Sequence, residues 1–151
     1  MIGVLTALWL LTGAVQSDAD RPVVILIYTN DTGFLHPLDT ARKAGDLWSG
    51  ELIAVQSLSE DFTVVRQDMT VEIDCAQNRA RTLHSRSYGH HGLLPHRETD
   101  TASAEWEPVD AEAWPTLQML HAIACKPVDL TAHGIPLAEA EERIRARIQD
   151  F

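Results

Sequence analysis

The chain is poor in cysteine, in aromatic side chains and in positive charge. Of its 151 residues only 2 are cysteine and 6% are aromatic, and 12 lysines and arginines stand against 22 acidic residues, for a formal net charge of -10. This negative charge repels phosphate backbones, so nucleic acid is not expected as a partner. Neither cysteine lies in a C-x-x-C motif, which argues against a thiol–disulfide oxidoreductase.

The sequence also lacks the short motifs of common enzymes. It contains no G-x-S-x-G, no H-E-x-x-H and no glycine-rich phosphate loop. Glu72 and Asp74 are predicted to share one strand face and could imitate a catalytic carboxylate pair. Acid–base chemistry also needs a pocket that gives the two groups different proton affinities, and no feature of the sequence indicates one. We therefore expect a protein that is not an enzyme and that binds no cofactor.

Residues 1–19 have the character of a signal peptide. Residues 1–15 are uncharged and apolar, but this run is shorter than the ~20 residues that span a bilayer. Small residues at the -3 and -1 positions allow cleavage after Ser17 or after Ala19. No lysine or arginine precedes the run, so a buried first strand or helix is the alternative. The prediction is a periplasmic or secreted protein with no membrane span.

The clearest strand covers residues 64–75, where side chains alternate in character. Val65, Met69, Val71, Ile73 and Cys75 fall on one face, and mostly charged residues fall on the other. Alternation with a period of two is typical of a strand with one buried and one solvated face. Further strands are expected at residues 23–28, 34–36, 47–57, 79–88 and 93–100. Gly33 is expected to supply a positive φ in the turn before residue 34, and Gly50 is a candidate for a bulge.

Two helices are expected near the C-terminal end. The first runs from Trp114 or Pro115 to Cys125, with apolar residues at helical spacing on the face that should lie on the sheet. Because Cys75 extends the buried row of its strand and Cys125 ends this helix, the two can meet as a disulfide. Residues 127–135 are predicted as a linker and residues 136–149 as a tail helix with a narrow apolar stripe. The tryptophans Trp48, Trp106 and Trp114 are expected in the core or at the helix contact.

The order of these segments resembles a known family. The segments are the turn at residues 30–33, the Arg-Lys-Ala-Gly-Asp run at 42–46, the strand ending in Val-Glu-Ile-Asp-Cys at 71–75, Tyr88, the Trp-Glu-Pro-Val run at 106–109 and the helix ending at Cys125. Residues 23 to about 126 resemble the surface-adhesin protein E-like family of bacterial exported domains. The resemblance implies an α+β domain at residues 20–126, with about six antiparallel strands and one helix tied to the concave face by the disulfide. It also implies an exported protein without enzymatic activity, to which residues 127–151 add a linker and an extra helix.

One basic patch stands out on this acidic chain. Four of the 12 basic residues and four of the seven histidines fall between residues 79 and 97: Arg79, Arg81, His84, Arg86, His90, His91, His96 and Arg97. This patch is a candidate anion-binding site that should strengthen as histidines protonate below about pH 6.5. The alternative is an ordinary solvated strand face. No cysteine or carboxylate stands at a structural-zinc spacing from the histidines, so no metal is expected.

These observations predict an exported, non-enzymatic binding module of the bacterial envelope, acting in surface adhesion or protein binding. A protein or an acidic polysaccharide is the expected kind of partner. The alternative from another class is a structural or envelope-stress protein that recruits its partner through the tail helix. The oligomeric state does not follow from the sequence.

Overall fold

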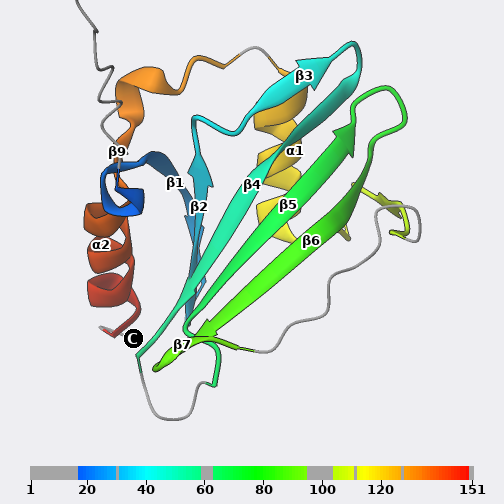
Figure 1. Cartoon of the computed structure of the whole chain (residues 1–151). Coiled ribbons are helices and arrows are strands. Elements are labelled where there is room, and N and C mark those ends of the chain that lie inside the picture. Colours follow the sequence, from blue (N-terminus) through cyan, green and yellow to red (C-terminus); the bar gives the residue numbers. More distant parts are fainter. Residues whose placement is uncertain are drawn as a thin grey trace, which may run out of the picture.

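A computed structural model describes residues 17–29, 31–58, 63–94, 104–110, 112–126 and 128–149, which form one curved sheet with two α-helices (Figure 1). In chain order the elements are η1 (Asp18–Asp20), β1 (Pro22–Tyr28), β2 (Thr32–Pro37), β3 (Arg42–Ala44), β4 (Leu47–Gln56), β5 (Arg66–Asp74), β6 (Arg79–Gly89), β7 (Gly92–Leu93), β8 (Glu107–Pro108), α1 (Pro115–Cys125), η2 (Thr131–His133), β9 (Ile135–Pro136) and α2 (Leu137–Gln149). In this described part of the chain, no helix is long and apolar enough to cross a membrane.

The nine strands pair in the order β7-β6-β5-β4-β2-β1-β9, with β3 beside β4 and β8 beside β6. Every pair is antiparallel, so the predicted α+β class is confirmed. The expected number of about six strands was too low because β3, β7, β8 and β9 have only two or three residues each. Strands this short carry no readable periodicity. Of the long strand predicted at 93–100, the structure shows only β7, and residues 95–100 lie outside the described residues.

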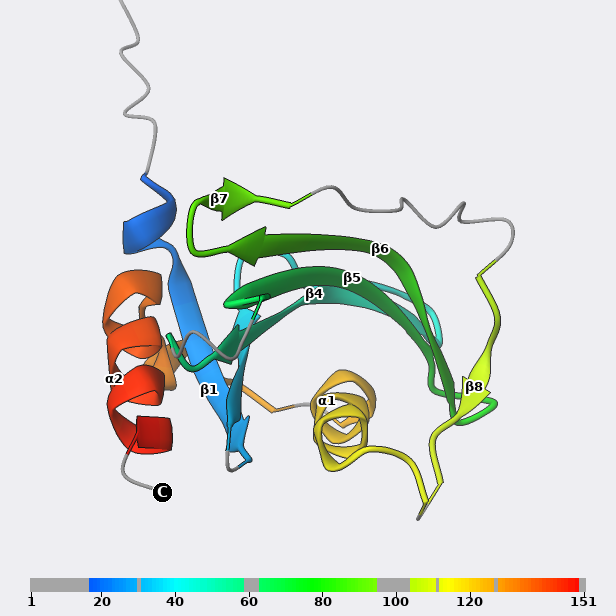
Figure 2. The same ribbon diagram turned by 90° about the horizontal axis from the view of Figure 1, so that it is seen from below.

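The curved sheet has an inner, concave face and an outer, convex face. Alternating residues of β4 divide between them: Trp48 and Leu52 pack on the inner side, whereas Ile53 and Val55 pack on the outer side. Figure 2 shows α1 in the hollow of the sheet and α2 against the opposite side, next to β1. Each helix therefore closes its own hydrophobic cluster, and the shared strands separate the two.

Helix α1 lies on the inner face as predicted. Its residues Leu120 and Ala124 are buried against Val71 and Ile73 of β5, which confirms the alternation expected for that strand. Cys75 and Cys125 form the predicted disulfide, with their Cα atoms 5.4 Å apart. The disulfide thus joins the end of β5 to the last turn of α1.

Helix α2 is fully docked on the outer face. Leu137, Ala140, Ile144 and Ile148 are each no more than 6% exposed and pack with residues of β1, β2 and β4. The narrow apolar stripe is sufficient because its small Ala140 lets the helix lie close to the strands. Salt bridges add further contacts, since Arg66 of β5 lies 2.9 Å from Glu141 of α2.

Gly33 is required for this docking, and its predicted role in the turn was wrong. Among the described glycines, φ is positive at Gly45 and Gly92 and not at Gly33, which lies in β2 and pairs with Tyr28 and Val55. A Cβ atom at Gly33 would lie 2.5 Å from Cγ2 of Ile144. The glycine therefore makes room for the tail helix.

Two smaller predictions also need correction. Gly50 is no bulge, because β4 and β5 pair in regular register across it; a Cβ atom there would lie 2.5 Å from the ring of Trp48. Trp48 is buried as expected, but Trp114 is 76% exposed. Trp114 precedes the first residue of α1, so its side chain is not on the helix face that packs against the sheet.

Candidate binding trough

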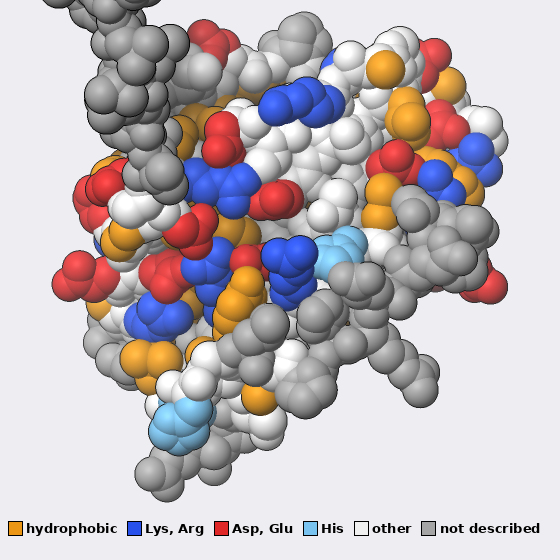
Figure 3. Space-filling model, viewed as in Figure 1, with side chains coloured by type: hydrophobic (Ala, Val, Ile, Leu, Met, Phe, Trp, Pro, Cys, Tyr) orange, Lys and Arg blue, Asp and Glu red, His pale blue; other side chains and the backbone are white. Residues whose placement is uncertain are grey.

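The outer face of β4, β5 and β6 is mainly polar where α2 does not cover it. Figure 3 shows arginine, acidic and histidine side chains gathered side by side over this face. The arrangement follows from register. A bulge at Leu83 lies between the pairs Thr70–His84 and Val71–Thr82. Because of this extra residue, odd-numbered residues before the bulge (Arg79 and Arg81) and even-numbered residues after it (His84 and Arg86) all lie on the outer face.

This register neutralises one end of the predicted basic patch. Arg81 lies 2.7 Å from Glu72, and Arg79 lies 3.0 Å from Asp74. Both guanidinium groups also lie over the ring of Trp106, at 4.6 Å and 4.5 Å from its centroid. Glu72 and Asp74, the possible catalytic pair, are therefore each bound by an arginine. The ring of Trp106 lies against both arginines.

The remaining patch residues are spread along the sheet. Strand β6 is roughly 35 Å long at ~3.3 Å per residue, with Arg79 and Arg81 at one end. His90 and His91 are exposed in the turn at the other end. His96 and Arg97 lie outside the described residues. Within the described ranges, no three histidine, cysteine or acidic side chains are grouped as metal ligands.

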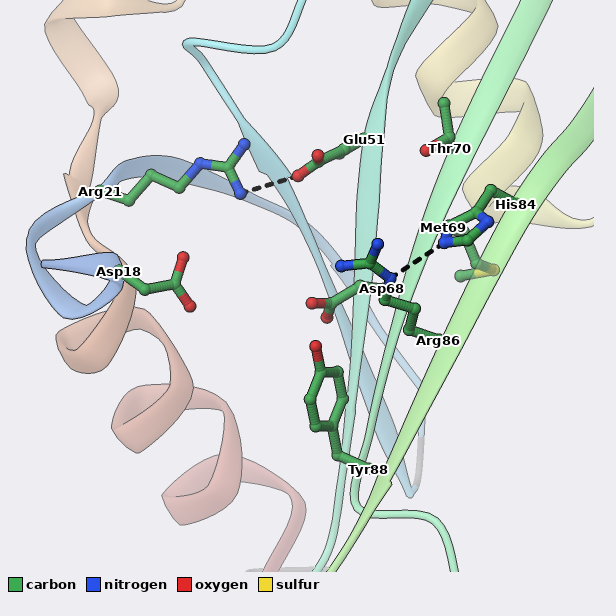
Figure 4. A pocket seen from close by; sticks show the side chains of 9 residues that line it. All are labelled: Asp18, Arg21, Glu51, Asp68, Met69, Thr70, His84, Arg86 and Tyr88. Carbon is green, nitrogen blue, oxygen red and sulfur yellow. Dashed lines mark hydrogen bonds and ion pairs between the residues drawn. The ribbon is translucent and has the colours of Figure 1, made fainter. Parts of the chain in front are cut away.

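His84 and Arg86 instead line a trough with a volume of about 370 Å³ between β6 and η1. Figure 4 shows Asp18 and Arg21 on the side of η1, His84 and Arg86 on the side of β6, and Asp68 between them. A second hollow of about 280 Å³ continues from it toward β3 and shares Glu51 and Thr70 with the first. Together they form one polar trough across the outer face, which we call the outer trough.

Two arginines hold the acidic residues of the outer trough. Arg21 lies 2.7 Å from Glu51 and 2.8 Å from Asp39. Burial disfavours the charged guanidinium of Arg21, but the hydrogen bonds to these two carboxylates outweigh burial and raise its pKa. Both carboxylates are thereby neutralised and fixed in position.

Arg66 has the same function on the side of the tail helix. Its guanidinium binds Asp68 at 2.6 Å, Glu141 at 2.9 Å and Asp18 at 3.4 Å. Burial again opposes the charge, and the surrounding carboxylates raise the pKa of Arg66. It also lies over the ring of Tyr88, 5.5 Å from the centroid. Arg66 therefore joins η1, the sheet and α2 into one rigid wall of the outer trough.

Among the described residues, Arg86 and Arg42 are the arginines of the outer trough that pair with no carboxylate. Arg86 is exposed and donates from Nε to Nε2 of His84 at 3.0 Å, and among the described residues it has no carboxylate within ion-pair distance. Arg42, in the second hollow, donates to the backbone oxygens of Asp39 and Ala41 and likewise pairs with no carboxylate in the described ranges. Each hollow thus presents one guanidinium to solvent.

Sequence reasoning identified part of this site. The predicted basic patch included His84 and Arg86. The sequence did not indicate the other lining residues, among them Arg21, Arg42, Glu51, Thr70 and Tyr88. No local pattern could have joined these residues, because they come from strands far apart in sequence that meet only in the folded sheet.

Comparison with known protein-family models, with characterised proteins and with solved structures finds no match to this chain.

Proposed function

We propose that this protein is an exported, non-enzymatic binding module of the bacterial envelope and that it binds its partner in the outer trough. The observation that carries the proposal is the trough itself. It is lined mainly by polar side chains, it lies on the part of the outer face that α2 leaves uncovered, and ion pairs with Arg21 and Arg66 hold its acidic residues in place. Ligand sites are usually concave and largely preformed, and precisely placed polar groups fix the orientation of the ligand.

Export to the periplasm or beyond is supported by the disulfide. Disulfides form and persist in oxidising compartments and are rare in a reducing cytosol. The Cys75–Cys125 bond, together with the apolar character of residues 1–15, therefore favours a secreted or periplasmic location.

The resemblance to the surface-adhesin protein E-like family stays a prediction. In its favour, the sheet with one helix on its concave face, joined by the disulfide, is the arrangement that the resemblance implies. Adhesion itself is a property of a site and does not follow from a fold. We therefore propose binding as the function and leave adhesion as one form that it can take.

The outer trough is a better candidate surface than the tail helix. Recruitment through an amphipathic helix uses its apolar side. In α2 that side is occupied, since Leu137, Ala140 and Ile144 are buried against the sheet. A partner of α2 would meet mainly charged side chains such as those of Glu139 and Arg143.

The test is capture of the partner from the native envelope by crosslinking and co-purification. We compare the wild type with Thr70→Trp, which fills the outer trough where its two hollows join. The matched control is Arg143→Glu on the exposed side of α2. Loss of the partner with Thr70→Trp alone supports the proposal. Loss with Arg143→Glu alone favours the tail helix, and turnover of a hydrolase substrate panel that Thr70→Trp abolishes overturns the non-enzymatic part.

A further inference from the structure

We infer that the outer trough binds a polysaccharide with acidic groups spaced far apart along a mostly neutral chain. The inference rests on the proposed function and specifies its ligand. Its basis is the position of Arg42 and Arg86, one in each hollow, with hydroxyl and paired carboxylate groups between them.

The two arginines require anionic groups on the ligand. Arginine presents a planar fork of donors that suits carboxylate and sulfate oxygens. The other arginines of the outer face that border the trough, Arg21 and Arg66, are already occupied by protein carboxylates. Arg42 and Arg86 are not, so an anion from solvent completes their hydrogen bonding without displacing an existing ion pair.

The spacing of the arginines requires an extended ligand. Arg42 pairs with Ser49, which pairs with Glu72, whereas Arg86 pairs with Asp68. Their Cα atoms are thus separated by three strand spacings of about 4.8 Å and four residues of about 3.3 Å, or roughly 20 Å. Arg42 is also held to the backbone of its own turn. A ligand that contacts both arginines across this span is therefore an extended molecule.

The lining between the arginines favours sugars over a polypeptide. Thr40, Ser49 and Thr70 present hydroxyl groups there, and the carboxylates of Glu51 and Asp39 can accept hydrogen bonds from sugar hydroxyls. Protein interfaces are usually centred on apolar and aromatic side chains. The residues that line the second hollow include no apolar or aromatic side chain, whereas Met69 and Tyr88 line the first hollow.

The acidity of the protein excludes a densely charged ligand. With a net charge of -10, the chain repels polyanions at long range. Between Arg42 and Arg86, the described lining of the trough offers an added acidic group no arginine or lysine that is not already bound to a protein carboxylate. A ligand whose acidic groups coincide with Arg42 and Arg86, and whose intervening units are neutral, meets both conditions.

Oligogalacturonates of one length and three degrees of methyl esterification test the inference by titration calorimetry. Partly esterified chains should bind most tightly, whereas fully esterified and fully acidic chains should bind at least about fivefold more weakly. Arg42→Gln and Arg86→Gln should each weaken binding of the partly esterified probe at least about tenfold, the effect expected for loss of one hydrogen bond to a charged group. Arg143→Gln, on the exposed side of α2, is the matched control and should leave binding unchanged.

Several results would overturn the inference. These are equal binding of the fully esterified chain, equal or tighter binding of oligoglutamate, full affinity in both trough variants, or no binding of any chain. If no sugar binds but Thr70→Trp still abolishes capture of an envelope partner, the ligand class is wrong and the proposed function stands. If Thr70→Trp leaves the captured partner unchanged, the proposed function itself is wrong.

Discussion

Gly33→Ala should destabilise the protein, because it adds one methyl group where the tail helix touches the sheet. The new Cβ atom would lie 2.5 Å from Cγ2 of Ile144 and 2.8 Å from its Cγ1 and Cδ1 atoms. Ile144 is completely buried, and a β-branched side chain in a helix has essentially one χ1 rotamer. The side chain cannot rotate away, so the strand or α2 must move.

The expected cost is the difference between two effects. Overpacking a core by one methyl group costs about 1–3 kcal/mol. Replacing glycine by alanine in a strand returns about 0.5–1 kcal/mol through the unfolded chain. The net destabilisation is centred on about 1 kcal/mol and reaches about 2.5 kcal/mol, and each kcal/mol lowers the melting temperature by about 2–4 °C in a domain of this size.

A double-mutant cycle separates this clash from other effects. Ile144→Ala removes the three atoms that the new methyl group meets and should cost about 2–5 kcal/mol by itself. In that background Gly33→Ala should be neutral or stabilising, which gives a coupling of at least about 1 kcal/mol between the two sites. Urea melts of the oxidised protein, followed by circular dichroism, provide all four free energies of unfolding.

The matched control is Gly134→Ala. Its Cβ atom would lie 2.9 Å from Cδ1 of Leu38, the end of a flexible and half-buried side chain, and its φ of -67° suits alanine. This variant should be neutral or slightly stabilising. Additive costs for Gly33→Ala and Ile144→Ala, or a Gly33→Ala variant as stable as the wild type, would show that α2 does not pack on β2 as described.

Three further predictions test the core and its disulfide. Replacing both Cys75 and Cys125 by serine should cost about 2–4 kcal/mol, and mass spectrometry of unreduced, alkylated wild type should find no labelled thiol; two labels would refute the bond. Ile73→Asp places an unpaired carboxylate at a fully buried position and should unfold or nearly unfold the domain. Glu72→Gln breaks one ion pair and should cost about 1 kcal/mol or less, as measured by thermal melts. If Glu72→Gln is the more damaging change, the register of β5 is shifted by one residue. Burial lowers the pKa of His36 below 6.5, so below that pH the unfolded chain binds a proton that the folded chain does not. The contribution of His36 to the free energy of unfolding should therefore be complete above pH 6.5 and decrease as the pH falls below it. A His36→Leu variant whose free energy of unfolding shows the same acid dependence between about pH 7 and pH 5 would contradict this assignment.

Local patterns in the sequence were sufficient to predict several elements. The alternation over residues 64–75 identified the buried residues of β5, and proline at the start with lysine and proline after the end delimited α1. The disulfide followed from the same two patterns, because Cys75 continues the buried row and Cys125 ends the helix. These features depend on neighbours within one or two turns of chain, where the periods of strand and helix can be read directly.

The tertiary structure alone decided which surfaces remain available. The sequence predicted Gly33 in a turn. Only the docking of α2 shows that the missing side chain of Gly33 leaves room for Ile144. Arg81 and Arg86 belonged to the same predicted basic patch, yet the bulge at Leu83 places Arg81 beside Glu72, whereas Asp68, which lies opposite Arg86, is bound by Arg66. The physical reason is that an ion pair or a close approach depends on the register between strands distant in sequence. That register results from the packing of the whole sheet and both helices, which no single segment encodes.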